Sequence, residues 1–114
     1  MRNLISYLFV FSGFIIFSSC EKVVYESPVI PEQVSFQTDV APALQKDCIQ
    51  CHDVFKKSTN YYKKLATSTF LDTVNAESSK TYVKLNTNDT HKGYTSPDNL
   101  AKILKWFEQG AKNN

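Results

Sequence analysis

The sequence predicts a small all-α domain that follows an N-terminal export signal. Apolar residues recur with helical spacing in the last segment, where Leu100, Ile103 and Phe107 share one face. A second helical repeat of apolar residues begins at Phe36. No strand pattern, in which apolar and polar residues alternate, occurs between these two segments. We therefore expect a bundle of short helices that is wrapped by loops.

Residues 1–19 have the pattern of a signal peptide of the lipoprotein type. Their apolar run, residues 4–17, is shorter than the ~20 residues that a transmembrane helix needs. The run ends in the letters IFSSC, which resemble the lipobox of bacterial lipoproteins; this resemblance implies cleavage before Cys20 and lipidation of that residue. The alternative is an ordinary secretory signal that leaves Cys20 free. Acyl chains on Cys20 would anchor the protein almost permanently.

The lipoprotein signal also predicts the location of the protein. We expect it to be exported and lipid-anchored to a membrane that faces the periplasm. Glu21 follows the lipidated cysteine, in place of the aspartate that is associated with retention in the inner membrane of some bacteria. The outer membrane is therefore favoured.

Residues 20–34 are expected to carry the lipid and to act as a tether. Pro28 and Pro31 favour an extended backbone, and the segment has no helical period. An edge strand packed on the domain is the alternative. The folded domain is then expected over residues 35–114, and a domain of this size commonly needs a cofactor, a metal or a disulfide to supplement its core.

The first helix of the domain is predicted by Phe36, Val40 and Leu44, which recur at every fourth position. Thr38 or Asp39 is its expected N-cap. This helix leads directly into the segment that carries two of the chain's three cysteines.

The middle of the domain has weaker patterns. Residues 53–75 mix apolar and polar positions without a clear period, and we expect a loop with one short helix at 60–66. The segment NAESSKTYVKL predicts another short helix, capped by Asn75 or Ser78. The polar segment NTNDTHKGYTS, residues 86–96, is expected to be a loop.

The last helix carries the clearest start and stop signals. Ser96 is its expected cap, Pro97 occupies the first helical position, and Gly110 ends it in a left-handed conformation. Trp106 lies beside the apolar stripe, and we expect it to be partly buried.

Cys48, Cys51 and His52 form the sequence C-x-x-C-H, which is the attachment signature of c-type haem. In one helical turn, the two thiols can form thioethers with the two vinyl groups of haem, and the adjacent imidazole can bind the iron. In a chain of this composition the motif arises by chance about once in a thousand cases. We therefore expect one covalently bound haem c.

Other uses of these cysteines fit the sequence less well. A zinc site requires four ligands, and beyond the motif only His91 and Cys20 remain. A thioredoxin-like pair follows a strand, whereas this motif follows a predicted helix. A disulfide between Cys48 and Cys51 leaves His52 without a role.

The second axial ligand of the iron is limited by composition. Met1 is the only methionine and lies in the signal peptide, so the mature domain has no methionine ligand. His91 is the only histidine besides His52. We expect His52 and His91 to bind the iron, and the alternatives are a five-coordinate iron or ligation by Lys92.

The segments around the motif resemble the small mono-haem c-type cytochrome lipoproteins of Bacteroidetes-type bacteria. The similar stretches are VSFQTDVAPALQKDCIQCH, AESSKTYVKL and HKGYTSPDNLAKILKWFEQGAKNN. They cover most of residues 34–114, although 53–74 are only loosely matched. The resemblance implies a cytochrome c-like fold, in which the N- and C-terminal helices cross and loops enclose the haem. It also implies a histidine ligand shortly before the last helix, where His91 lies.

The sequence departs from many cytochromes c in one respect. In those proteins a proline carbonyl shortly after the motif receives the N–H of the proximal imidazole, but no proline lies between Pro42 and Pro97 here. Another partner is therefore needed to orient His52. The aromatic residues are candidate walls of the haem pocket, although most of them are equally explained as core: Phe55, Tyr82, Tyr94 and Trp106, together with Tyr61, Tyr62 and Phe70.

The expected function is single-electron transfer by a membrane-anchored cytochrome that is not an enzyme, because no catalytic constellation is visible. Redox proteins are its expected partners, and it acts as a monomer or as a subunit of a membrane-associated complex. The net charge of +2 argues against binding of nucleic acid. The alternatives are a haem protein with an open iron position that reacts with gases or peroxide, and a haem-bearing accessory lipoprotein of a larger complex.

Overall fold

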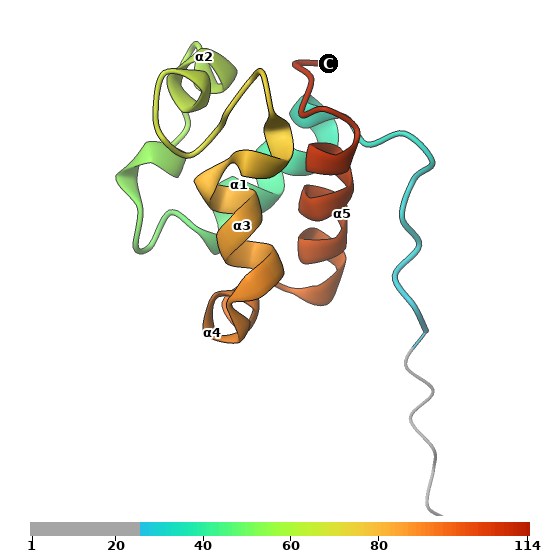
Figure 1. Ribbon diagram of the computed structural model, residues 1–114. Helices are drawn as coiled ribbons and strands as arrows, with labels where there is room; N and C mark the ends of the chain where they lie inside the picture. The colour runs from blue at the N-terminus through green and yellow to red at the C-terminus, as the bar shows by residue number, and fades with distance from the viewer. Residues whose placement is uncertain (1–25) are drawn as a thin grey trace, which may run out of the picture.

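The computed structural model describes residues 26–114, so the expected signal peptide and Cys20 lie outside the described residues. The elements follow in the order η1 (Phe36–Val40, a π-helical turn), α1 (Ala41–Asp47), η2 (Asp53–Phe55, a 3-10 turn), α2 (Tyr61–Ala66), η3 (Ala76–Ser78, a 3-10 turn), α3 (Lys80–Thr87), α4 (Asp89–Lys92) and α5 (Pro97–Glu108) (Figure 1). The described part of the chain contains no strand, which confirms the all-α class. Across residues 26–114, no helix combines the length and the apolar character that crossing a bilayer would need.

η1 and α1 form one continuous helical segment that buries all three residues of the predicted four-residue repeat. The helical backbone begins at Phe36, so the expected cap at Thr38 or Asp39 is wrong. Ser35 precedes the helix in an extended conformation, and its backbone N–H donates to the Asp39 carboxylate at 2.9 Å. Asp39 therefore supports the start of the helix from within its first turn.

The short helices in the middle of the chain agree only partly with the sequence prediction. α2 lies where it was expected, and α3 occupies most of the second predicted helix. α3 begins after Ser79 rather than after Asn75 or Ser78. The reason is a turn around Asp72, whose carboxylate accepts hydrogen bonds from the backbone N–H groups of Val74 and Asn75. Asn75 therefore belongs to this turn and precedes η3 instead of capping α3.

α4 lies in a segment that was expected to be a loop, and this prediction is wrong. The side-chain oxygen of Asn88 accepts the backbone N–H of His91 at 3.0 Å and caps the helix. Asp89 follows in the first turn, where its negative charge is favourable. These local signals are sufficient for one helical turn in spite of the polarity of the segment.

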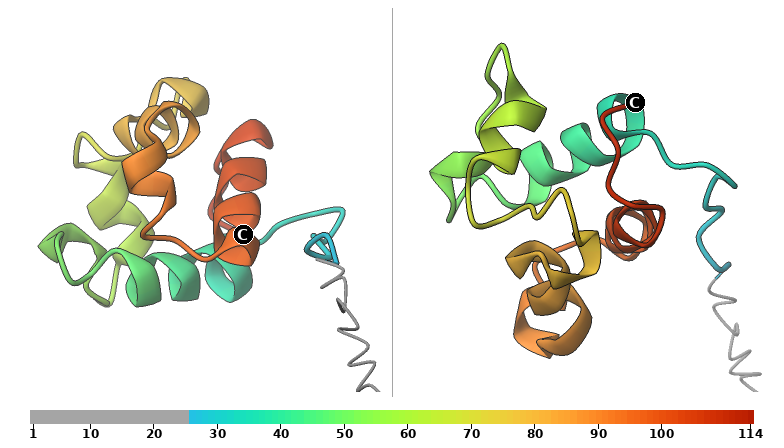
Figure 2. Two further views of the ribbon diagram at one scale, coloured as in Figure 1. Left: turned by 90° about the horizontal axis from the view of Figure 1, so that it is seen from below. Right: turned by 45° about the horizontal axis from the view of Figure 1, so that its top comes forward.

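α5 packs against η1 and α3, and it is steeply inclined to α1 in both views of Figure 2. Its capping is as predicted, since Ser96 Oγ accepts the N–H of Asn99 and Gly110 has a positive φ of 87°. Trp106 is 1% exposed and is therefore more deeply buried than expected. After Gly110 the chain turns back, so that the indole N–H of Trp106 donates to the carbonyl of Lys112 at 2.9 Å.

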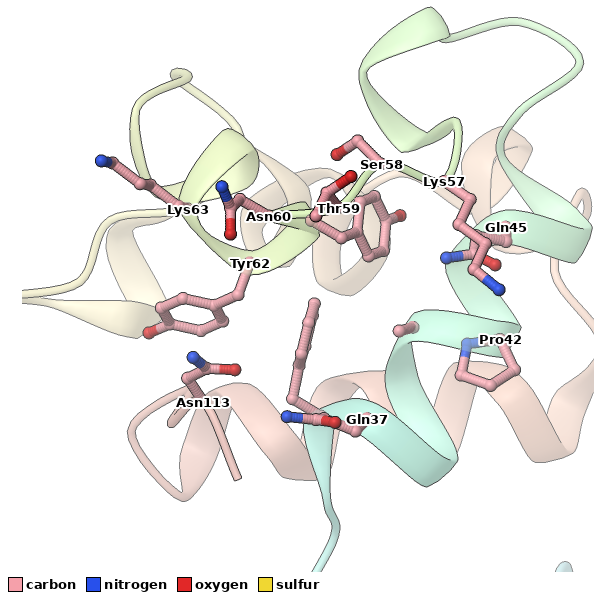
Figure 3. Close-up of a pocket in the computed structure, with 13 residues that line it drawn as sticks. Gln37, Pro42, Gln45, Lys57, Ser58, Thr59, Asn60, Tyr62, Lys63 and Asn113 are labelled. Carbon is pink, nitrogen blue, oxygen red and sulfur yellow. The ribbon is translucent and has the colours of Figure 1, made fainter.

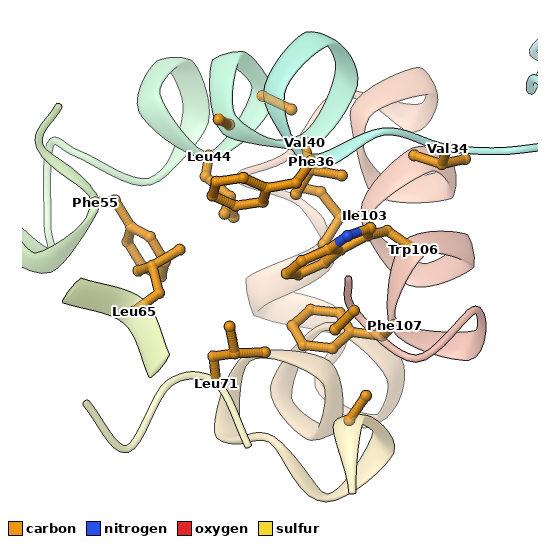
Figure 4. Packing of buried hydrophobic residues seen from close by; sticks show 14 of the residues in the cluster. Val34, Phe36, Val40, Leu44, Phe55, Leu65, Leu71, Ile103, Trp106 and Phe107 are labelled. Carbon is orange, nitrogen blue, oxygen red and sulfur yellow. The ribbon is translucent and has the colours of Figure 1, made fainter. Parts of the chain in front are cut away.

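The core joins the first and last helical segments. The rings of Phe36 and Trp106 lie 5.3 Å apart, and those of Trp106 and Phe107 lie 4.9 Å apart (Figure 4). Val34 is also buried, and its N–H donates to the side chain of Gln109 at 3.0 Å. The packed part of the chain extends further into the segment that we assigned to a tether, because Ile30 also packs against the core and the carbonyl of Glu32 accepts the side-chain N–H of Gln109 at 2.8 Å.

Candidate functional site

The C-x-x-C-H motif lies in a helical turn directly after α1. The N–H of Cys48 donates to the carbonyl of Leu44 at 3.0 Å, which continues the helix by one residue. The N–H groups of Cys51 and His52 then donate to the carbonyl of Cys48 at 3.4 and 3.1 Å. Since η2 begins at Asp53, the backbone of the motif is held from both sides.

The two thiols of the motif are not joined to each other. Cys48 is partly buried, whereas Cys51 is exposed. Burial raises the pKa of the Cys48 thiol to about 11, and the charges of Asp47 and Cys51 act in the same direction. Reactive cysteines of redox enzymes have a lowered pKa, so this environment does not favour a thioredoxin-like role.

The fold brings the two predicted iron ligands, His52 and His91, to the same place. Their ring centres lie 6.5 Å apart and their planes are inclined by 30°. His52 extends from the motif turn, and His91 lies in α4, whose start is fixed by Asn88. Among residues 26–114, no hydrogen bond engages a ring nitrogen of either histidine. Both imidazoles thus keep their metal-binding atoms available.

Both histidines line a cavity of about 650 Å³. This size is within the range of about 300–1,000 Å³ that ligand pockets usually have. The walls come from the motif, from Phe55 and Phe70, and from one face of α3 that includes Leu85. The lining surface is mainly apolar, and no carboxylate contributes to it. The cavity therefore suits a largely apolar ligand.

The imidazole ring of His52 packs edge to face against two phenylalanine rings. The His52 ring lies 5.9 Å from that of Phe55 and 5.6 Å from that of Phe70, and the two phenylalanine rings are 5.2 Å apart. This packing restricts the orientation of the imidazole without a hydrogen bond.

The other expected wall residues do not line the cavity. Trp106 belongs to the core, and Tyr82 packs on the Phe107 ring at 5.6 Å because that side of α3 is turned toward α5. Tyr94 is 69% exposed and lies beside His91, outside the cavity. Phe55 and Phe70 are thus the aromatic residues that the structure places at the site.

The alternative iron ligand Lys92 is engaged elsewhere. Its ammonium group pairs with the exposed carboxylate of Asp89 at 3.2 Å, and it does not line the cavity. Lys80 and Lys84, which the sequence interpretation did not assign to the site, do line it. Their spacing of one helical turn is the signal that would have placed them on one face of α3.

A second hollow of about 420 Å³ lies between η1, the start of α1 and residues 57–63 (Figure 3). Amides, hydroxyls and lysines such as Gln37, Asn60 and Lys63 predominate in it. It contains no histidine, cysteine or carboxylate, so it offers none of the usual side-chain metal ligands. The chemistry of the described residues is therefore concentrated in the cavity of the two histidines.

Comparisons with known proteins found no matching family model, no matching curated protein and no matching solved structure. The resemblance to c-type cytochrome lipoproteins therefore rests on the motif and on the segments around it.

Proposed function

We propose that the protein is a mono-haem c-type cytochrome that transfers single electrons and is held at a membrane by a lipid on Cys20. Cys48 and Cys51 would carry the haem through thioether bonds, and His52 and His91 would hold its iron. The observation that carries this proposal is the placement of the two imidazoles beside one mainly apolar cavity.

The distance between the two imidazoles is suited to a single iron between them. A bond between a metal and an imidazole nitrogen is about 2.0–2.1 Å long, and that nitrogen lies roughly 1.1 Å from the centre of its ring. Two imidazoles on opposite sides of one metal therefore have ring centres about 6.3 Å apart. The separation of His52 and His91 is 6.5 Å.

The number of ligands also favours haem over a bare metal ion. In residues 26–114, no group of three or more histidine, cysteine or acidic side chains is placed to hold a metal ion. A haem iron needs only two ligands from the protein, because the porphyrin supplies the other four. His52 and His91 provide those two.

The chemistry of the thiols fits covalent attachment. Each S–H adds across one vinyl group, so that sulfur bonds to one vinyl carbon and hydrogen to the other, and no oxidant is consumed. Cys48 lines the cavity and Cys51 lies one turn away on the exposed side.

The arrangement of the helices supports a cytochrome c-like fold. η1, near the start of the domain, packs against α5, near its end. The motif, Phe70 and α3 lie between them in the sequence and surround the cavity. In the cytochrome c fold, loops and helices between the first and last helices enclose the haem in the same order.

Full coordination of the iron would favour electron transfer over binding of a substrate at the iron. Bound haem would supply a one-electron couple, and His52 and His91 would hold its iron. His/His ligation is expected to give a lower reduction potential than the His/Met pair. Cys51 is exposed, so a haem attached to it would have that edge near the protein surface, within reach of a partner protein.

The proposal is tested by producing the chain with a c-type maturation system and recording its mass and absorption spectrum. We expect one haem per chain, a low-spin iron, and no change of the reduced spectrum with carbon monoxide. The variant His91→Ala is expected to become high-spin and to bind carbon monoxide, whereas the control Lys92→Gln is expected to keep the spectrum of the unchanged protein.

The same spectra separate the proposal from its alternatives. If the unchanged protein binds carbon monoxide readily, the iron has an open position, and a gas- or peroxide-reactive haem protein is favoured. If His91→Ala keeps a low-spin iron, His91 is not the ligand. Stable co-purification of the holoprotein with a larger complex would instead favour an accessory subunit.

A further inference from the structure

Lys80 and Lys84 give the cavity a positive charge that nothing in the described residues compensates. The two residues lie one turn apart on α3 and both line the cavity. No aspartate or glutamate lines it, and the ion pairs found within residues 26–114 involve other lysines. The cavity thus combines an apolar interior with two ammonium groups.

This combination selects for a particular ligand chemistry. Lysine side chains lay their apolar stems along apolar surfaces and keep the charged end near water. Both residues are exposed, so their ammonium groups can remain hydrated at the edge of the cavity. A ligand that fills the interior and presents carboxylates at this edge would form charge-assisted hydrogen bonds with both.

We propose that Lys80 and Lys84 bind the two propionate carboxylates of the haem. The inference rests on the proposed function and adds the residues that position the cofactor at an edge other than the one attached to Cys48. The pair neutralises the propionates and places positive charge near the iron. Because oxidation adds one positive charge to the iron, both effects disfavour the oxidised state and raise the reduction potential.

The test is the reduction potential of the matured holoprotein at low ionic strength. The double variant Lys80→Gln/Lys84→Gln is expected to shift the redox equilibrium roughly tenfold toward the oxidised form, which corresponds to about 59 mV for one electron. The double variant Lys80→Arg/Lys84→Arg keeps both charges and is expected to keep the potential. Salt should reduce the difference between the glutamine pair and the unchanged protein, because ions screen exposed charges.

The matched control is Lys57→Gln/Lys63→Gln. These two exposed lysines line the second hollow (Figure 3), and their loss changes the net charge by the same amount. We expect the control pair to shift the potential far less than the α3 pair. Equal shifts would show that only the overall charge matters and would overturn the inference.

Failure of this inference is distinguishable from failure of the proposed function. If the protein carries haem and its reduction potential does not depend on Lys80 and Lys84, the proposed cytochrome function is supported and the proposed contacts with the propionates are contradicted. If the chain never acquires haem, both proposals are contradicted. If the glutamine pair matures poorly, the single variants Lys80→Gln and Lys84→Gln are measured instead, and each is expected to give about half of the shift on a logarithmic scale.

Discussion

The imidazole rings of His52 and His91 lie 6.5 Å apart, although one belongs to the motif turn after α1 and the other to α4. Different interactions fix the positions of the two rings. The ring of His52 packs edge to face against Phe55 and Phe70, whereas the position of His91 depends on a single helical turn capped by Asn88. The His91 side of the site is therefore the one more easily disturbed.

Removing the cap of α4 should loosen the ligand that this helix carries. In Asn88→Ala the backbone N–H of His91 loses its acceptor, and loss of such a cap typically costs about 0.5–2 kcal/mol. We expect the holoprotein to gain a fraction of iron that binds carbon monoxide, measured by its absorption spectrum. Asn86→Ala alters an exposed asparagine without a side-chain hydrogen bond in residues 26–114 and should leave the spectrum unchanged. An Asn88→Ala protein as unreactive as the Asn86→Ala control would count against this role of the cap.

Two adjacent tyrosines should respond in opposite ways to loss of the hydroxyl group. The hydroxyl of Tyr61 is buried and has no hydrogen-bond partner among residues 26–114, and burial together with the nearby Cys48 raises its pKa. The hydroxyl of Tyr62 donates to the carbonyl of Ala111 at 2.8 Å. Tyr62→Phe loses a hydrogen bond and should therefore lower the free energy of unfolding by about 0.5–1.5 kcal/mol. Tyr61→Phe removes an unsatisfied buried hydroxyl and should leave the free energy of unfolding unchanged or raise it, by at most about 3 kcal/mol.

The two tyrosine variants are compared by urea unfolding of the matured holoprotein. Tyr61 lines the second hollow and does not line the cavity of the two histidines, so the haem proposed for that cavity is not expected to supply an acceptor to its hydroxyl. A loss of stability in Tyr61→Phe equal to that in Tyr62→Phe would mean that the Tyr61 hydroxyl has a partner after all.

The Asp72 turn should make stability depend on pH in the acid range. Hydrogen bonds from the backbone N–H of Asn75, the backbone N–H of Val74 and the hydroxyl of Ser78 lower the pKa of this carboxyl below its ordinary value of 3.8. A lowered pKa means that the ionised form stabilises the fold above pH 3.8 and that this contribution is lost as the pH falls through the folded-state pKa. Asp72→Asn should therefore be less stable than the unchanged protein near neutral pH, with a difference that shrinks in acid.

The Asp72 prediction is checked by thermal unfolding of both proteins from neutral pH down to the limit of acid stability. Glu77→Gln removes a nearby exposed carboxylate that has no hydrogen bond among residues 26–114, and it should give no such pH-dependent difference. A difference between Asp72→Asn and the unchanged protein that stays constant with pH would contradict the prediction.

The motif and the end of α5 were predictable because their signals are local. The spacing from Cys48 to His52 fits one helical turn, and the turn is present. Ser96 and Gly110 begin and end α5 through contacts with near neighbours in the sequence. Local hydrogen bonds of this kind depend little on the rest of the fold.

The walls of the cavity were less predictable because they depend on packing between distant segments. Trp106 and Phe70 are both aromatic, yet the first belongs to the core and the second lines the cavity. The indole N–H of Trp106 donates to the carbonyl of Lys112, which it reaches because the chain turns back after Gly110. No pattern in the sequence around either residue indicates that arrangement.

The central claim is that haem is bonded to both cysteines of the motif, and peptide mass spectrometry of the matured protein tests it most directly. Trypsin cleaves after Lys46 and Lys56, so residues 47–56 are released as one peptide with both thiols. We expect this peptide to carry the mass of one haem and to resist alkylation of Cys48 and Cys51. Recovery of the same peptide without haem, and with both thiols alkylated, would contradict the account.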